Sequence, residues 1–222
     1  MKRIPQLIFL VLFLAACQTL PAIKPEAGSQ KIVCPSPFLK EQYRLVHAID
    51  IHMAGETRGG IIGVTVADPA NRFVSCAIMT AEGMVLFEAE ANAALKVIRA
   101  LPPFDSAAFT RNMIEDIKLI FFAPEGELQL KGNLPDGSSF CRWSDEGSGW
   151  IDVIAREPEG VEINKYDAWG SLTRRVKLGS GAENVYANIR LTATELFDYS
   201  LTLTLIEAEP REAELKTESP ER

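Results

Sequence analysis

Apolar and polar residues alternate along most of residues 45–207 of this 222-residue chain. Successive side chains of a β-strand point to opposite faces, so this period of two predicts strands. In the clearest case, residues 45–53, one face carries Leu45, His47, Ile49, Ile51 and Met53. Further strands are expected at 61–66, 73–80, 84–90, 128–131, 139–144, 150–155, 161–166, 172–178, 185–192 and 199–207.

Turn-forming residues separate these segments, such as the run Asp68-Pro69-Ala70-Asn71. Short strands joined by polar turns are typical of an antiparallel meander. The pattern therefore predicts a mainly β fold with helix (α+β). Its centre is a curved antiparallel sheet, or incomplete β-barrel, covered by an amphipathic helix.

That helix is expected between Asp105 and Ala123. Asp105 is a candidate N-cap, and Pro124 disfavours helical geometry at the residue before it. An apolar stripe with helical spacing consists of Phe109, Met113, Ile117, Ile120 and Phe121. Residues 88–101 fit either a helix or, after a turn near Asn92, a strand from Leu95 to Leu101.

The two ends of the chain differ from its centre. A basic start followed by the apolar run 7–16 has the layout of a secretory signal peptide. Residues 17–40 contain several prolines and are expected to form an extended tether. The last residues are rich in Glu, Lys, Arg and Pro, which predicts a disordered tail over 208–222. The folded domain is therefore expected to span 41–207.

The segment Leu14-Ala15-Ala16-Cys17 resembles the lipobox of bacterial lipoproteins. This resemblance implies that Cys17 carries diacylglyceryl and acyl (palmitate-type) groups after the signal peptide is removed. The next residue is Gln18. An Asp at this position would resemble the inner-membrane retention mark of such lipoproteins. The resemblance thus implies a lipid-anchored protein on the periplasmic face of the outer membrane.

Composition excludes some partners. The chain carries 23 basic and 30 acidic residues, and loss of Lys2 and Arg3 with the signal makes it still more acidic. An acidic surface repels phosphate backbones, so nucleic acid is not an expected partner. The other three cysteines are Cys34, Cys76 and Cys141. Any two of them could form a disulfide, so three pairings stay open. None has metal-binding spacing, so neither a metal nor another cofactor is expected.

A lipobox, a tether, a β-meander, a central helix and a second meander together resemble the LolA and LolB lipoprotein-localisation proteins. The residues that carry this resemblance are the stretches 80–87 (TAEGMVLF) and 115–124 (EDIKLIFFAP). The resemblance implies an acyl-chain cavity between sheet and helix. The candidate residues of cavity and lid are Phe109, Met113, Ile117, Ile120, Phe121, Phe87 and Trp150. The loop Gly55–Gly60 lacks a large apolar residue, which argues against LolB-like insertion of lipoproteins.

No catalytic motif is present: the sequence has no G-x-S-x-G, P-loop, H-E-x-x-H or S-x-x-K pattern. His47 and His52 are expected on opposite faces of one strand. The adjacent acids Glu115 and Asp116 are expected on a solvated helix face, and the pair Arg174-Arg175 on the surface. Core packing is expected for Trp143, Trp150 and Trp169.

We therefore expect a non-catalytic, membrane-anchored lipid- or lipoprotein-binding protein with an acyl-chain or other apolar ligand. A second hypothesis is an accessory subunit of an outer-membrane complex that binds other envelope proteins and has no ligand cavity. A third is a hydrolase-like enzyme whose site has no recognisable motif.

Overall fold

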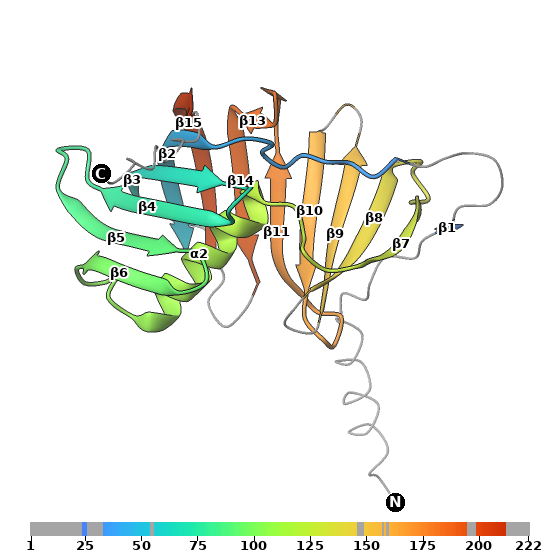
Figure 1. Cartoon of the computed structure of the whole chain (residues 1–222), viewed down its shortest axis with the longest axis horizontal. Coiled ribbons are helices and arrows are strands. Elements are labelled where there is room, and N and C mark those ends of the chain that lie inside the picture. The colour runs from blue at the N-terminus through green and yellow to red at the C-terminus, as the bar shows by residue number, and fades with distance from the viewer. Residues whose placement is uncertain are drawn as a thin grey trace, which may run out of the picture.

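Strands of one antiparallel sheet make up most of the molecule (Figure 1). The computed structural model describes residues 24–25, 33–53, 56–145, 149–156, 158, 160–194 and 199–211. From one edge to the other, the sheet contains β1 (Lys24–Pro25), β7 (Leu128–Asn133), β8 (Ser139–Asp145), β9 (Gly149–Arg156), β10 (Gly160–Tyr166), β11 (Leu172–Leu178), β14 (Asn188–Ala193), β15 (Tyr199–Pro210), β2 (Tyr43–Met53), β3 (Glu56–Asp68), β4 (Phe73–Met79), β5 (Val85–Ala91) and β6 (Leu95–Ala100). A separate hairpin is formed by β12 (Gly181–Ala182) and β13 (Val185–Tyr186).

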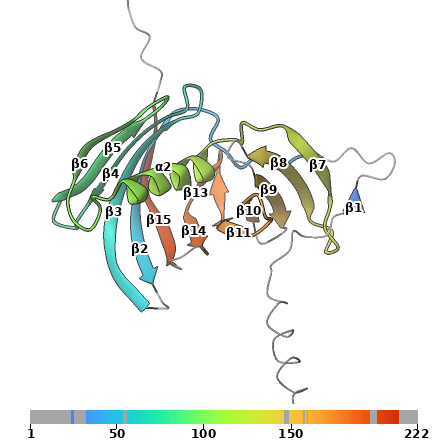
Figure 2. The ribbon, with the colours of Figure 1, turned by 90° about the horizontal axis from the view of Figure 1, so that it is seen from below.

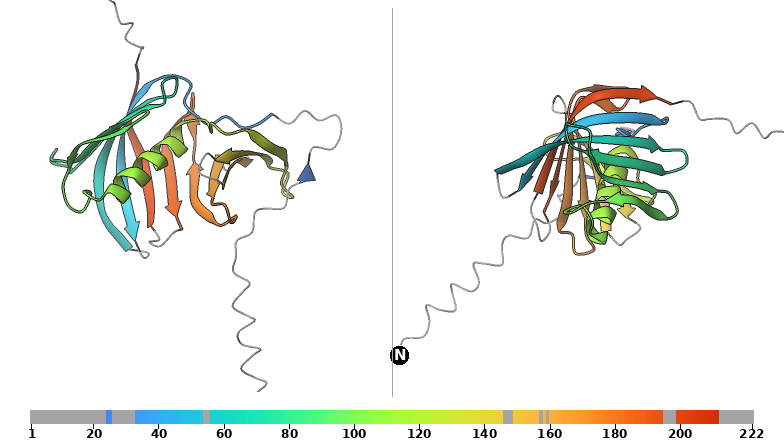
Figure 3. Two further views of the ribbon diagram at one scale, coloured as in Figure 1. Left: turned by 60° about the horizontal axis from the view of Figure 1, so that its bottom comes forward. Right: turned by 90° about the vertical axis from the view of Figure 1, so that its left-hand side faces the viewer.

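Two meanders build this sheet, one from β2 to β6 and the other from β7 to β15. They join where β15 pairs with β2, with Leu203 opposite Ile49. The other ends, β6 and β1, do not meet, so the sheet is curved and unclosed (Figure 3). The expected antiparallel, incomplete barrel is confirmed to this extent.

The two faces of the sheet differ. We call the face that bears His47 the helix face, because the His47 ring lies 6.2 Å from the ring of Phe121 in the helix. Residues directly opposite each other on paired strands share a face, so Ile49 places Ile61 and Leu203 on the same side. The main apolar core gathers strand residues of this face together with helix residues. The opposite side is called the outer face.

The helix α2 (Ala107–Phe121) connects the two meanders and runs obliquely past the central strands (Figure 2). Its N-cap is Ser106, whose hydroxyl accepts a hydrogen bond from the Phe109 N–H at 3.1 Å, so the expected cap at Asp105 was wrong by one residue. Both residue types suit this position, and only the backbone geometry distinguishes them. The helix ends at Phe121, shortly before Pro124 as expected.

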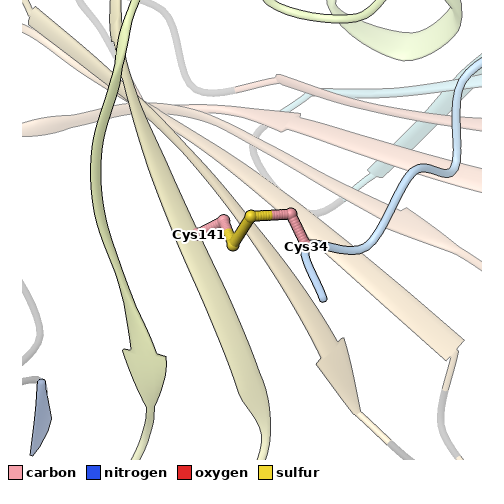
Figure 4. The surroundings of a disulfide bond; sticks show 2 residues. All are labelled: Cys34 and Cys141. Carbon is pink, nitrogen blue, oxygen red and sulfur yellow. A yellow bond between two sulfur atoms is a disulfide. The ribbon is translucent and has the colours of Figure 1, made fainter. Parts of the chain in front are cut away.

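Residues 33–42 cross the molecule from β8 to β2 and belong to the fold. Cys34 forms a disulfide with Cys141 of β8 (Figure 4), while Cys76 is a buried free thiol. Phe38 and Leu39 lie in the main core, and the Leu39 N–H donates to the Phe121 carbonyl. The predicted tether boundary at residue 40 was therefore too late, because contacts distant in sequence order this proline-rich segment.

The C-terminal boundary also differs from the prediction. Strand β15 continues to Pro210, so Ala208–Pro210 are not part of a disordered tail. These residues pair with the start of β2, and Arg44 bonds to both Glu207 and Glu209. Local composition does not show this, because the pairing partner lies over 160 residues away. The predicted signal peptide, Cys17 and residues 212–222 lie outside the described residues.

The backbone hydrogen bonds of the structure decide two further predictions about strands. Residues 88–101 form the end of β5, a turn and β6, which is the strand alternative. The single strand expected at 185–192 is divided at Ala187 into β13 and β14. In the described part of the chain, no helix has the length and apolar character needed to cross a membrane.

Candidate functional site

The apolar residues of α2 are buried to different degrees. Ile114, Leu119, Ile120 and Phe121 in its middle and C-terminal part are buried in the main core. Phe109 and Met113 nearer the N-terminus, and Ile117 in the C-terminal half, are only half-buried. All candidate lid residues of the helix lie on α2, but they form two groups. Ile120 and Phe121 are buried, whereas Phe109, Met113 and Ile117 are partly exposed.

Strand residues of the helix face also differ in burial. Leu45 and His47 near the start of β2 are buried, whereas Ile49 and Ile51 are half-buried and Met53 is exposed. Leu201 and Ile61 on the neighbouring strands are also half-buried. Large apolar side chains from three strands therefore stay partly accessible on the face along which α2 runs. We call this set and the half-buried helix residues the open apolar region: Ile49, Ile51, Met53, Ile61, Leu201, Phe109, Met113 and Ile117.

The aromatic residues of the predicted cavity have separate positions. Phe87 of β5 is fully buried, with its ring edge-to-face against Phe109 at 5.7 Å. Trp150 alternates with Ile151 and Val153, which belong to the main core, so it lies on the outer face. Its assignment to the cavity is therefore corrected. The alternation was visible in the sequence, but not which face would meet the helix.

The other two tryptophans also differ from each other. Trp143 is half-buried against the main core, as expected. Trp169 lies in the turn between β10 and β11 and is 92% exposed, so core packing was wrong for this residue. A turn residue escapes burial because no second layer of the fold lies over it.

A hollow of about 220 Å³ lies beside the C-terminal half of α2. Its apolar wall includes Phe38, Leu119, Phe122 and Ile151, but charged residues line it as well. Among these, Lys165 bonds to Glu115 and Asp145 at 3.3 and 3.1 Å. Burial lowers the pKa of Lys165, but the two carboxylates outweigh this and raise it overall. The hollow is small and mixed in polarity, so it does not match an acyl-chain cavity.

A buried polar linkage fixes α2 to the sheet. Asp116 is only 7% exposed and accepts hydrogen bonds from Arg174 Nε at 2.8 Å and from the Tyr199 hydroxyl at 2.7 Å. These partners come from β11 and β15 on either side of β14. Burial raises the pKa of Asp116, and the hydrogen-bonded cation and hydroxyl oppose that rise. We call these three residues the helix linkage.

The helix linkage overturns two expectations. Asp116 is not on a solvated helix face, and Arg174 is buried rather than on the surface. The neighbours Glu115 and Arg175 keep partly exposed positions. One signal in the sequence pointed to this arrangement: Asp116 directly precedes Ile117 and lies four residues before Ile120, on the apolar side of the helix.

The histidines do not form a catalytic group. His47 is 3% exposed, and burial lowers its pKa to about 4. His52, near the end of the same strand, contacts the Thr57 hydroxyl at 3.1 Å. Among the described residues, no cluster of His, Cys, Asp and Glu side chains has a metal-binding arrangement. Burial also raises the pKa of Cys76 to about 12, which keeps this thiol protonated and unreactive.

A second buried ion pair lies on the outer face. Arg142 makes two hydrogen bonds to Asp152, at 2.6 and 2.7 Å, and its guanidinium group lies over the ring of Phe140. Both residues are buried, and burial raises the pKa of Asp152 against the influence of Arg142. Because both carboxylate oxygens of Asp152 accept hydrogen bonds from Arg142 on the neighbouring strand, this pair is structural.

The helix linkage predicts a stability loss on substitution. Asp116→Ala is expected to lower the free energy of unfolding by about 3–5 kcal/mol, because it removes a carboxylate from a buried ion pair. Glu115→Ala changes the adjacent, exposed acid and is expected to cost about 0.5 kcal/mol or less. Urea unfolding of both variants is the measurement. Equal stability of the two would contradict the assigned role of Asp116.

Burial of His47 predicts a pH dependence. Its folded pKa of about 4 lies below the unfolded value of 6.5, so the unfolded chain binds more protons between these values. Stability is therefore lost as the pH falls, by about 2 kcal/mol between pH 7 and 4.5. Asp116 and Asp152 have raised pKa values and act in the opposite direction, so variants must be compared. His47→Gln is expected to remove this loss, whereas His52→Gln should keep it. Urea unfolding at the two pH values tests the difference.

Comparison with known proteins gives similarity at the level of the fold. No protein-family model matches the chain, and no curated protein matches it. A solved LolA superfamily protein from Nitrosomonas europaea aligns with a TM-score of 0.50 and 9% identity, over 79% of this chain and 89% of that one. A domain described as an outer membrane lipoprotein-sorting protein, from Vibrio parahaemolyticus, aligns with a TM-score of 0.46 and 8% identity, over 77% and 86% of the two chains. The first of these two alignments shows that the chain has a LolA-like fold.

Proposed function

We propose that this chain is a non-catalytic lipid- or lipoprotein-binding protein of the periplasm, anchored to the outer membrane. The observation that carries the proposal is the open apolar region on the helix face. Soluble domains rarely leave several large aliphatic side chains partly accessible in one place, unless a ligand or partner covers them. The LolA-like fold supports a ligand with acyl chains.

In this proposal α2 covers the open apolar region as a lid. Its C-terminal half is held by the main core and by the helix linkage, so it stays in place. Its N-terminal half rests on Phe109 and Met113, which are only half-buried. An acyl chain would enter beneath this half and contact Ile49, Ile51 and Leu201. The mixed-polarity hollow at the other end of α2 has no part in holding it.

Anchoring through Cys17 is proposed from the resemblance of Leu14–Cys17 to a lipobox. The disulfide between Cys34 and Cys141 supports the same compartment, because disulfides persist in the oxidising periplasm and are rare in the cytosol. Residues 18–33 would link the lipid to the disulfide. A lipid with several acyl chains gives a stable anchor, since each buried methylene contributes about 0.8 kcal/mol.

The hydrolase hypothesis has less support. A general base must reach its substrate and titrate near neutral pH. His47 meets neither condition, because it is buried and its pKa is lowered to about 4. The accessory-subunit hypothesis has an observation in its favour, namely the exposed edge strand β6, and this strand is considered below.

Uptake of a fluorescent fatty acid by the full chain tests ligand binding. Met113→Asp places a carboxylate in the open apolar region and is expected to weaken binding at least tenfold, because burial of an unpaired charge is costly. Asn112→Asp is the matched control, since it adds the same charge at an exposed position of the same helix. Native mass spectrometry of the purified chain should also show a bound lipid. Equal fatty-acid binding by the two variants would refute the assigned site.

Labelling of cells with a palmitate analogue tests the anchor separately. Cys17→Ser is expected to abolish incorporation of the label and to release the protein from the outer-membrane fraction. Cys76→Ser changes a buried thiol and should leave both results as in the wild type. Continued labelling of the Cys17 variant would show that the anchor lies elsewhere.

A further inference from the structure

The edge strand β6 carries apolar side chains that the described part of the chain leaves partly exposed. Leu95, Val97, Ile98 and the following Leu101 are between 39% and 47% exposed. One edge of β6 pairs with β5. No strand of the described chain pairs with its other edge. An edge of this kind presents unpaired N–H and C=O groups together with apolar side chains, which is the usual template for an added strand.

The opposite edge of the sheet is partly occupied by another segment of the chain. There, Lys24 and Pro25 of β1 pair with Asn133 and Gly132 of β7, so the chain's own N-terminal segment occupies part of that edge. Strand β6 has no such partner among the described residues. The two edges are therefore not equivalent, and the more apolar one is left uncovered.

The side chains of β6 separate charge from apolar surface. Val97 lies opposite Ala89, which belongs to the main core, so Leu95 and Val97 are on the helix face. Lys96 and Arg99 are on the outer face, opposite Glu90 and Glu88. Arg99 makes no ion pair with any residue that the structure describes. On the outer face, β5 thus carries acidic residues and β6 carries basic residues. Acidic side chains on a strand added beside β6 would continue this alternation of charge.

We propose that β6 binds an extended segment of another protein as an additional antiparallel or parallel strand. The segment would place acidic side chains beside Lys96 and Arg99, and apolar side chains beside Leu95 and Val97. Main-chain hydrogen bonds would supply affinity, and this alternation would supply specificity. The charge of β6 is complementary to such a partner although the chain as a whole is acidic, with a net charge of −7.

Two other occupants fit the strand less well. In an antiparallel pair of two β6 strands centred between Val97 and Ile98, Lys96 of each copy faces Arg99 of the other. Like charges directly opposite each other destabilise a sheet, so self-association is disfavoured. A lipid bilayer would accept the apolar side chains, but its interior provides no hydrogen-bond partners for the strand's backbone.

Binding of a defined peptide to the full-length chain in detergent tests the proposal. The probe is a fluorescein-labelled peptide of roughly eight residues in which glutamate and valine alternate, about the length of a strand. Lys96→Glu combined with Arg99→Glu is expected to weaken its binding at least tenfold, and to allow binding of a lysine–valine peptide. Neutral Lys96→Gln with Arg99→Gln serves as a second variant, and circular dichroism checks that each is folded. Lys177→Glu with Arg190→Glu, on exposed positions of inner strands, should change neither result.

Backbone methylation of the peptide separates strand addition from simple adhesion. The methylated peptide has no amide hydrogens to donate, so its binding should be lost. Undiminished binding of that peptide would overturn the proposal. The same conclusion would follow if the charge variants bound both peptides like the wild type. Two further results would also refute it: dimerisation in sedimentation that the Lys96 and Arg99 variants abolish, or attachment to anionic phospholipid vesicles through these residues without peptide binding.

Discussion

The position of α2 on the sheet depends on one buried carboxylate. Asp116 receives hydrogen bonds from Arg174 and Tyr199, which belong to strands on either side of β14. A buried ion pair of this kind adds little net stability compared with apolar packing, but it tolerates few alternative arrangements, since each charge must find its partner. The helix linkage therefore sets where along the sheet the apolar stripe of α2 makes contact, and with it which strand residues stay accessible.

The two halves of the sheet are completed in different ways. Over β7 to β10, the crossing segment 33–42 and its disulfide to Cys141 supply a covering layer that a single helix cannot reach. Over β2 to β6, α2 is the element that packs against the sheet, and part of the helix face stays half-exposed. The open apolar region is the consequence of this unequal cover. The proposed lipid site and the uncovered β6 strand both belong to the less covered half.

These features suggest a division of roles within one LolA-like fold. A ligand would bind on the helix face, and a partner protein would extend the sheet at β6. The two sites are linked through β5, because Phe87 of β5 contacts Phe109 of the proposed lid and β5 pairs with β6. A strand added to β6 would lie close to the N-terminal half of α2, which is the half proposed to admit the ligand. Binding of a partner and access of the ligand are thus expected to influence each other.

Strand positions, the helix and the unclosed antiparallel sheet follow from the sequence, because periods of 2 and 3.6 residues are properties of single segments. Ile49 and Ile51 alternate whatever lies opposite them, and Phe109 and Met113 share a helix face by spacing alone. The tertiary structure decided the rest. It selected Cys141 as the partner of Cys34, continued β15 to Pro210, turned Trp150 away from the helix and buried Asp116 with Arg174. Each of these depends on a contact between residues far apart in the chain, and local patterns contain no information about which distant segment supplies the partner.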